Sequence, residues 1–290
     1  MIESVLRDTA AAWLAAGRDA VVVEIVDARG SVPRGAGTRM VVAAEAALGT
    51  IGGGHLELKA SCAARRMLER RELTRREERY ALGPSLGQCC GGTVTVRLEA
   101  LTAASLARWP SSTPLFHLQL HGAGHVGRAI ATALATLDCR VDWFDERDDE
   151  FPSTTELGSP WPPHIRRADT GTIEKAVQEA PPGAFYLVLT HEHALDERIT
   201  EAILRRGDFA FCGLIGSKTK RAKFVRRMEA RGVDRATIGR LTCPIGVSGI
   251  DGRAPEIIAV AVVAQLLQVV SGTAGTMSSQ SVDEAAAGRP

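Results

Sequence analysis

The chain has 290 residues, of which 45% are hydrophobic and 24% are charged, with a formal net charge of +1 at pH 7. That length predicts two domains, each able to bury a core, and the balanced charge excludes a general attraction to nucleic acid or to a membrane surface. Six cysteines in so long a chain do not form a disulfide framework, and the N-terminal residues lack the pattern of a secretory leader, so the sequence predicts a cytoplasmic protein.

The first hundred residues predict a small α+β domain over residues 1–102. Amphipathic stretches indicate helices there, and runs of β-branched residues indicate strands. The expected elements are a helix at 3–17, strands at 20–28 and 38–43, a helix from the glycine-rich turn 49–57 to about 71, and strands at 75–82 and 93–101. The segment that follows, 103–114, carries prolines and serines and is predicted to be a linker.

Two glycine-rich loops, 29–37 and 49–57, interrupt this first domain. Glycine reaches backbone conformations that other residues resist, and loops of this kind suit a polar, anionic ligand held largely by main-chain N–H groups. Simple tight turns are the alternative for either loop taken alone. The candidate ligand-binding residues here are Arg34, Gly52, Gly53, Gly54, His55 and Glu57.

A third loop places Cys89 and Cys90 directly before two glycines. Adjacent cysteines rarely bridge each other, because a disulfide requires a larger separation of the two Cα atoms. In a glycine loop the two thiols are candidates for accessible thiolates that contact a soft metal or carry sulfur. Burial as small apolar side chains is an equally weighted alternative, and it is the favoured prediction for Cys62, Cys139 and Cys212.

The most specific pattern lies between residues 115 and 145. An apolar run ends in the sequence GAGHVG, a helical pattern follows, and a second apolar run ends on Asp145. This is the first β-α-β unit of a dinucleotide-binding fold, in which glycines let the backbone approach a phosphate at a helix N-terminus and an acid reaches a ribose hydroxyl. The candidate residues are therefore Gly122, Gly124, His125, Gly127 and Asp145.

Strand and helix patterns alternate through the rest of the chain. Strands are expected at 116–120, 140–144, near 165, 185–190 and 209–215, and helices at 126–137, 172–179, 196–206, 218–231 and 255–270. Such alternation predicts a Rossmann-like parallel sheet with helices on both faces, over residues 115–272. The apolar stretch 257–270 is predicted to be a buried helix, and the small residues of 273–290 a disordered tail.

Polar residues follow two of the later strands, where an open parallel sheet binds its ligands. Ser217 is predicted to cap a helix whose N–H groups, together with nearby lysines, suit an anion. A metal site is a second possibility for the histidines, but their spacing matches no standard zinc pattern, so pocket lining or capping is favoured. The candidate residues are His191, His193, Asp196, Gly216, Ser217 and Lys218.

Seven motifs occur in a fixed order: GSVPRGAGTRM, GTIGGGHLE, the CCGG loop, HGAGHVGRAIA with its DER, THEHALD, GLIGSKTKR, and CPIGV followed by GRAPEIIAVAVVAQLL. Through them the chain resembles the XdhC/CoxI family, the accessory proteins of xanthine dehydrogenase and related molybdenum hydroxylases. The resemblance runs from about residue 9 to residue 270.

The resemblance implies an N-terminal domain before a Rossmann-type domain, assembly as a homo-oligomer, and an accessory role in place of an enzymatic one. It implies that the protein binds molybdenum cofactor, a molybdopterin in mono- or dinucleotide form. The protein would hold the cofactor while a cysteine desulfurase supplies sulfur, and then insert it into xanthine dehydrogenase or a related molybdenum hydroxylase.

On this hypothesis the two groups of loops bind different ends of the ligand. Arg34, Gly52–Gly54 and either Cys89 or Cys90 would face the molybdenum end. The helix after Gly122–Gly127 and the turn Ser217–Lys220 would hold phosphate, and Asp145 would hold the ribose of a dinucleotide form.

Two other classes of function are weighed beside it. An NAD(P)-dependent oxidoreductase would use Gly122–Gly127 and Asp145 for NAD and His191 or His193 as acid–base catalyst, but residues 1–110 show no catalytic pattern. A nucleotide-sensing regulatory module without chemistry would use the N-terminal half as an interaction surface. The fold alone serves too many functions to separate these alternatives.

Overall fold

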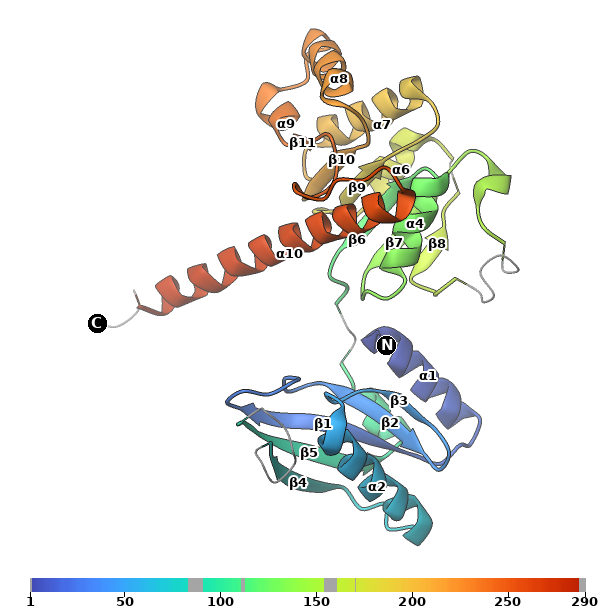
Figure 1. Ribbon diagram of the computed structural model, residues 1–290, viewed down its shortest axis with the longest axis vertical. Coiled ribbons are helices and arrows are strands. Elements are labelled where there is room, and N and C mark those ends of the chain that lie inside the picture. The colour runs from blue at the N-terminus through green and yellow to red at the C-terminus, as the bar shows by residue number, and fades with distance from the viewer. Residues whose placement is uncertain (1, 83–90, 111–112, 154–160, 170, 287–290) are drawn as a thin grey trace. The chain divides into compact units, whose positions relative to one another are not determined.

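The computed structural model describes residues 2–82, 91–110, 113–153, 161–169 and 171–286 (Figure 1). The chain divides into two compact units, residues 1–113 and 114–290. The division falls at the end of the predicted linker. The α/β class is confirmed: an antiparallel sheet forms the first unit and a Rossmann-like parallel sheet the second.

The N-terminal unit is a five-stranded antiparallel sheet with helices against both faces. In chain order its elements are α1 (Glu3–Ala15), β1 (Ala20–Arg29), β2 (Arg39–Ala43), β3 (Ala47–Gly49), α2 (Gly54–Arg70), β4 (Arg76–Ala81), β5 (Thr93–Ala100) and α3 (Ala103–Ala107). The strand order is β3-β2-β1-β5-β4. Because successive residues of a strand point to opposite faces, Val21 and Val23 of β1 pack under α2, while Val22 packs under α1.

The structure forms a helix, α3, inside the segment predicted to be a linker. Thr102 accepts a hydrogen bond from the backbone N–H of Ser105, and the Ser105 hydroxyl oxygen accepts one from the backbone N–H of Thr102. This reciprocal capping box satisfies two backbone donors that would otherwise be unpaired at the helix start. Trp109, just beyond α3, is buried and its indole N–H donates to Glu3. The chain therefore leaves the N-terminal unit only after residue 110.

The C-terminal unit is built on a six-stranded sheet in which every pair is parallel. In chain order its elements are β6 (His117–His121), α4 (His125–Leu134), β7 (Arg140–Phe144), η2 (Asp148–Glu150), β8 (Ile165–Arg167), α6 (Ile173–Glu179), β9 (Phe185–Val188), α7 (His193–Arg206), β10 (Phe211–Leu214), α8 (Lys218–Ala230), α9 (Arg235–Gly239), β11 (Leu241–Thr242) and α10 (Pro255–Ala286). The strand order β11-β10-β9-β6-β7-β8 is that of dinucleotide-binding folds. The order reverses between β6 and β9, where such folds bind their ligands.

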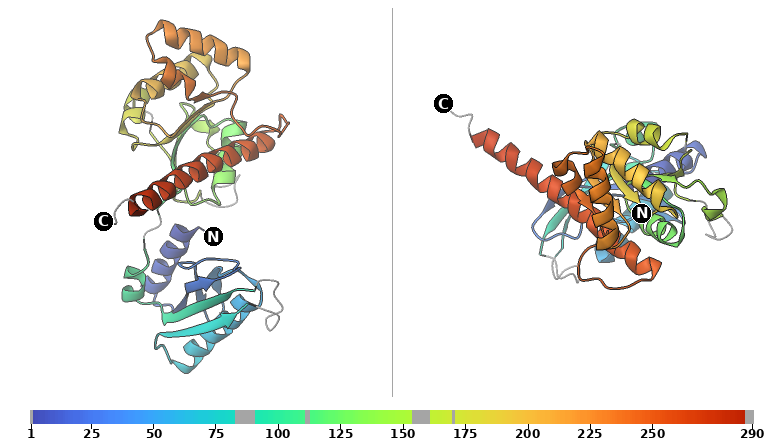
Figure 2. Two further views of the ribbon diagram at one scale, coloured as in Figure 1. Left: turned by 90° about the vertical axis from the view of Figure 1, so that its left-hand side faces the viewer. Right: turned by 90° about the horizontal axis from the view of Figure 1, so that it is seen from above.

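Helices α4 and α10 cover one face of this sheet (Figures 1 and 2). Leu118 and Leu120 of β6 pack there with Trp143 of β7, and α10 contributes Val262 and Leu266 to the same core. Over Pro255–Gly272 α10 has the length and composition of a membrane span, with a mean hydropathy of 1.6, as core helices of globular proteins also have. The predicted buried helix is therefore buried along one face only.

Helix α10 continues to Ala286, where the sequence predicted a disordered tail over 273–290. The segment from 271 to 286 contains neither proline nor a pair of adjacent glycines, so its backbone can continue the i→i−4 hydrogen bonds of the core helix that precedes it. Its C-terminal half extends away from the strands of the sheet (Figure 2).

The opposite face of the sheet has two unlike halves. Over β9 and β10 it is apolar, and Tyr186, Val188 and Leu214 pack against α6, α7 and α8. Over β6, β7 and β8 the same face carries polar side chains, which the register places side by side across the strands. These side chains are His117, Gln119, His121, Arg140, Asp142 and Arg166.

Asp142 is the centre of a charged cluster on the polar half. Its carboxylate accepts hydrogen bonds from His117 Nε2 at 2.6 Å and from Arg166 Nε at 2.5 Å, and its side chain is only 9% exposed. Burial alone would raise the pKa of this carboxyl, but the hydrogen bonds and charges of His117 and Arg166 outweigh burial and lower the pKa to about 2.

We predict that Asp142→Asn makes the free energy of unfolding less dependent on pH in the acid range. A carboxyl whose pKa is about 2 when folded and near 4 when unfolded contributes stability above pH 4 and loses it as pH falls toward 2. The contribution is about 2 kcal/mol. Urea unfolding at pH 6 and at pH 2.5 should show a smaller difference in the variant than in the native protein. Asp251→Asn, at an exposed position, is the control and should leave the difference unchanged.

Candidate functional site

The glycine loop after β6 has the geometry that phosphate binding requires. A Cβ on Gly122, whose φ is +124°, would lie 2.3 Å from the carbonyl oxygen of Leu189, and a Cβ on Gly127 would lie 2.1 Å from that of Gly122. Nothing lies within 4 Å of the place where a Cβ on Gly124 would stand. The outer glycines therefore allow close packing of backbone, and the middle one leaves room for a ligand, as the fingerprint predicts.

The N-terminus of α4 opens into that space. Gly124 is its N-cap, and no side chain of the described residues accepts a hydrogen bond from the first backbone N–H groups of the helix. Those donors and the positive end of the helix dipole suit a phosphate or carboxylate. His125 is exposed on the first turn, so its imidazole is accessible to such an anion.

Asp145 lies where the sequence placed it, at the end of β7, but its carboxylate is used inside the protein. Oδ2 accepts the backbone N–H of Ala123 at 2.6 Å and Nη2 of Arg147 at 3.0 Å, while Oδ1 accepts the backbone N–H and Nε of Arg147. The side chain is 2% exposed. Burial works against ionisation, but the hydrogen bonds from Arg147 and Ala123 outweigh it and hold the pKa below its usual value. Four donors saturate the carboxylate, so none of its acceptor sites is left for a ribose hydroxyl.

Two arginines join this carboxylate to the loop, and the sequence analysis did not single them out. Arg147 pairs with Glu150 at 2.9 Å as well as with Asp145, and Arg128 pairs with the other oxygen of Glu150 at 3.0 Å. Arg128 also donates to the carbonyl oxygen of Ala123. The available signal was Arg147, the single arginine among the acids from Asp145 to Glu150, because an arginine two residues after a buried acid is within reach of it.

The ends of β9 and β10 are joined by a buried ion pair. Lys220 Nζ lies 2.6 Å from Asp196 Oδ2 and donates to the carbonyl oxygen of Ile215. The other carboxylate oxygen of Asp196 accepts the backbone N–H and the hydroxyl of Thr190. Ser217 caps α8 as predicted, accepting from the backbone N–H of Lys220. Lys218 is exposed at the start of α8, whereas Lys220 is the cation that pairs with Asp196.

The histidines predicted to line this edge point to solvent. His191 and His193 are both exposed, whereas Asp196, on the same helical turn, is buried. Among the described residues no group of three or more His, Cys, Asp or Glu side chains has the arrangement of a metal site. Gly216 lies against the Lys220 side chain, where a Cβ would come within 2.5 Å of the Lys220 Cδ.

In the N-terminal unit the three glycine-bearing loops meet. The backbone N–H of Gly92 donates to Ser31, and a Cβ on Gly30 would lie 3.2 Å from the Gly92 Cα. A Cβ on Gly52, whose φ is +119°, would lie 2.6 Å from the Pro33 ring. The close approaches require glycine, and they gather three segments that are distant in sequence at one place.

Glu57 holds the second of these loops in shape. One of its carboxylate oxygens accepts the hydroxyl of Thr50 at 2.5 Å and the backbone N–H groups of Ile51 and Gly53. Glu57 is therefore a structural residue of the loop. Arg34 and His55 are exposed beside it, and neither has a hydrogen-bond or ion-pair partner among the described residues.

The cysteines differ from one another in exposure. Cys89 and Cys90 lie outside the described residues, and Gly91, which follows them, begins the described chain again. Cys139 and Cys212 are buried as predicted, and burial raises the pKa of each thiol to about 12. Cys62 is exposed, which corrects the prediction that it is buried. It lies on the face of α2 opposite Ala60, Ala64 and Met67, the residues that pack on the sheet.

Comparison with known families matches both units. The sequence model of the XdhC Rossmann domain matches residues 118–266, and that of the XdhC and CoxI family matches residues 13–80. The chain belongs to the XdhC and CoxI family. The first match covers the glycine loop and Asp145, and the second covers both glycine-rich loops of the N-terminal unit.

Two known proteins are similar to this XdhC-family protein over most of its length. It is 31% identical over 264 residues to the Escherichia coli K12 protein called uncharacterized protein YqeB, a match that takes in 88% of this chain and 44% of YqeB. The chain thus spans less than half the length of that relative. The crystal structure of a Bacillus halodurans protein described as a xanthine dehydrogenase matches with a TM-score of 0.73 at 21% identity, over 94% of this chain and 96% of that one. This likeness establishes the fold.

We predict that the glycines of the phosphate loop separate into structural and ligand-facing positions. Gly127→Ala places a Cβ against the Gly122 carbonyl and should lower the free energy of unfolding by about 2 kcal/mol or more. Gly124→Ala has open space and an ordinary φ of −65°, so it should cost within about 1 kcal/mol. Urea unfolding of both variants measures the difference, and equal costs would contradict the assignment.

A second pair of variants tests the buried ion pair. Lys220→Met leaves the Asp196 carboxylate, 2% exposed, without its cation, and should lower the free energy of unfolding by about 3 kcal/mol. Lys218→Met changes an exposed lysine two residues away and should cost less than about 0.5 kcal/mol. A comparable loss in both variants would show that helix α8, and not the ion pair, responds to the substitution.

Proposed function

We propose that this protein binds molybdenum cofactor and acts as its chaperone, holding the cofactor during sulfuration and inserting it into a molybdenum hydroxylase. The client would be xanthine dehydrogenase or a related enzyme, and the sulfur donor a cysteine desulfurase. In this proposal the protein is a non-catalytic, cytoplasmic homo-oligomer. Membership of the XdhC and CoxI family motivates the proposal.

The observation that carries the proposal is the meeting of three glycine-bearing loops in the N-terminal unit. Arg34 on the first loop has no hydrogen-bond or ion-pair partner in the described part of the chain, and the CCGG loop packs its second glycine against Ser31. When bound, the cofactor supplies a molybdenum ion held by a dithiolene, with the terminal oxo and sulfido groups on which hydroxylase chemistry depends. An arginine, backbone N–H groups and thiolates are the protein groups that suit the charged, soft end of that ligand.

In the C-terminal unit the loop Gly122–Gly127 fits a phosphate. The uncapped N-terminus of α4 and the open space beside Gly124 would receive it, and His125 would lie next to it. The saturated carboxylate of Asp145 argues against an NAD-dependent oxidoreductase, because NAD enzymes rely on this acid to bind the adenosine ribose. A phosphate terminus, as in the mononucleotide form, is therefore favoured over a dinucleotide.

The deciding experiment is equilibrium binding of molybdenum cofactor under anaerobic conditions, with NAD as competitor. We expect near-stoichiometric binding that a large excess of NAD does not displace. Micromolar binding of NAD without binding of the cofactor would overturn the proposal in favour of an oxidoreductase. Binding of neither, with ligand-independent assembly, would leave an interaction module.

Variants of the N-terminal loops test which residues bind the ligand. Arg34→Gln should weaken cofactor binding about ten-fold, because it removes a charge-assisted hydrogen bond donor from an exposed position without disturbing the fold. Arg226→Gln, at an exposed position on α8 with no partner among the described residues, is the matched control. Cys89→Ala and Cys90→Ala are each expected to lower retention of the cofactor. Unchanged binding in both would remove thiol ligation from the proposal.

A further inference from the structure

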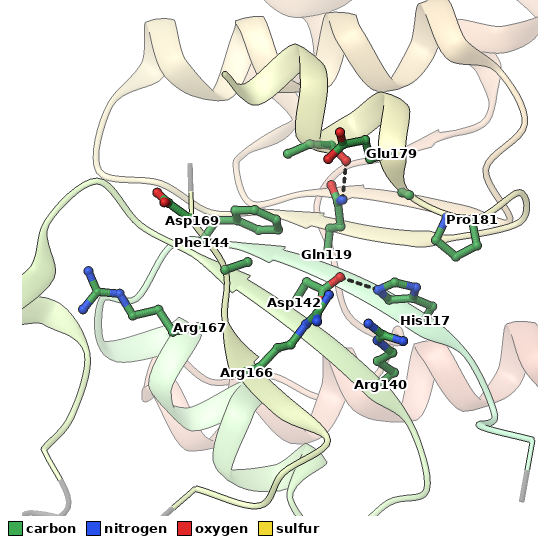
Figure 3. Close-up of a pocket in the computed structure, with 13 residues that line it drawn as sticks. His117, Gln119, Arg140, Asp142, Phe144, Arg166, Arg167, Asp169, Glu179 and Pro181 are labelled. Atoms are coloured by element: carbon green, nitrogen blue, oxygen red, sulfur yellow. Dashed lines mark hydrogen bonds and ion pairs between the residues drawn. The ribbon is translucent and has the colours of Figure 1, made fainter. Parts of the chain in front are cut away.

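A polar groove of about 640 Å³ lies on the face of the parallel sheet beside α6 (Figure 3). The polar half of β6, β7 and β8 forms its floor. Its walls are Ala176 and Glu179 near the end of α6, Ala180 and Pro181 directly after that helix, and residues 167–169 at the end of β8 and beyond it. The groove lies along the face of the sheet, whereas the glycine loop of the proposed phosphate site lies at the carboxyl ends of the strands.

Packing does not explain a polar floor in this position. Both faces of a parallel sheet are ordinarily apolar, since helices cover both. Here the neighbouring half of the same face obeys that rule, with Tyr186 and Leu214 buried under helices. Gln119 and Asp142 on the polar half are nevertheless only 3% and 6% exposed. Burying such groups costs free energy unless each is hydrogen-bonded, so each polar side chain of this floor needs a partner that an apolar side chain would not need.

The floor is ordered by the strand register. His117 is the partner of Arg140, and Asp142 is the partner of both Gln119 and Arg166. Figure 3 shows His117 and Arg140 side by side at one end of the groove, with Asp142 and Arg166 next to them. Two guanidinium groups and an imidazole therefore surround a single carboxylate.

Most of these groups already have partners. Gln119 donates to the carbonyl oxygen of Ala176 and accepts from His121, a neutral histidine because burial lowers its pKa to about 3. Asp142 is paired with His117 and Arg166. The Arg140 side chain has no hydrogen-bond or ion-pair partner among the described residues, and His117 uses only Nε2. This end of the groove consequently carries an unmatched positive charge and an unused imidazole nitrogen.

The rest of the rim has the opposite character. Asp169 follows β8 and lies beside Phe144, and Glu179 stands on α6 across from Gln119 (Figure 3). Both carboxylates are exposed. They accept hydrogen bonds and cannot donate them when ionised. A ligand that fits the whole groove is thus anionic at the Arg140 end and carries N–H or O–H groups toward Asp169 and Glu179.

We propose that this groove binds a small organic anion whose carboxylate or phosphoryl group lies on Arg140 and His117. The volume is in the range of small-molecule sites. A protein partner is disfavoured because the centre of a protein interface is depleted of charged residues, and the centre of this groove is a charged cluster. The inference is independent of cofactor binding, since it uses other residues on another part of the sheet.

Histidine-resolved NMR tests the site. The protein has seven histidines, so labelling the imidazole Cε1 gives seven signals, and His117→Gln identifies the one that reports on the groove. Inorganic phosphate and succinate are added in separate titrations at fixed pH and ionic strength. We expect a saturable shift of the His117 signal with one of them, which distinguishes a phosphoryl from a carboxylate ligand. Arg140→Gln should weaken that binding about ten-fold or more.

The controls separate this site from the others. Arg226→Gln should leave the titration unchanged, because it alters an exposed arginine on α8 outside the groove. A phosphate-dependent shift of His125 alone would place the anion at α4 and overturn the groove site, while agreeing with the phosphate site proposed at α4 for the cofactor. The proposal also fails if the His117 signal moves with neither anion. A change of oligomeric state in Arg140→Glu without any anion response would overturn it in favour of a protein interface.

Discussion

The contact between the backbones at Gly122, Gly127 and Leu189 is the constraint on which the C-terminal unit depends. It joins the end of β6 to the first turn of α4 and to the end of β9, the two strands between which the order of the sheet reverses. Because carbonyl oxygens lie 2.1 and 2.3 Å from where the two Cβ atoms would stand, no side chain fits at Gly127 or Gly122. The same contact aims the uncapped end of α4 into open space, so the packing that stabilises the fold also creates the proposed anion site.

Asp145 connects this loop to β7, and its carboxylate binds groups of the protein in place of a ribose. In a dinucleotide enzyme the acid at this position must keep acceptor sites for a ribose. Here it accepts the backbone N–H of Ala123 and the guanidinium of Arg147, and Glu150 extends the network to Arg128. Each partner lowers the free energy of the ionised carboxylate, and each removes an acceptor site from any ligand. The network therefore leaves Asp145 no acceptor site for a ribose and ties the glycine loop to the end of β7.

The sequence predicted local features well and tertiary partners poorly, for physical reasons. The roles of Gly122 and Gly127 and the cap at Ser217 follow from short-range geometry that the motif itself specifies. The pairing of Lys220 with Asp196 depends on helix phase, which leaves Lys218 exposed because residues two apart on a helix point to nearly opposite sides. The loops at Gly30, Gly52 and Gly92 meet because strands far apart in the sequence pair with each other, as β1 does with β5. The partners of Asp145 come from a turn, and a turn has no periodic sequence pattern from which they could be predicted. Such contacts require the assembled fold.

The polar half of the sheet is visible in the sequences of its strands, but it departs from the rule that both faces of a parallel sheet are apolar. Residues 117–121 read HLQLH and residues 140–144 read RVDWF, and this alternation of polar and apolar residues is typical of a sheet with one face exposed to solvent. Residues 185–188 read FYLV, which is typical of a sheet covered on both faces. Strands of both kinds lie next to each other here, with β6 paired to β7 on one side and β9 on the other. One sheet thus combines a fully packed half with a half whose polar side chains form the floor of the proposed ligand groove. The boundary runs between β6 and β9, the same pair of strands at which the chain reverses its order.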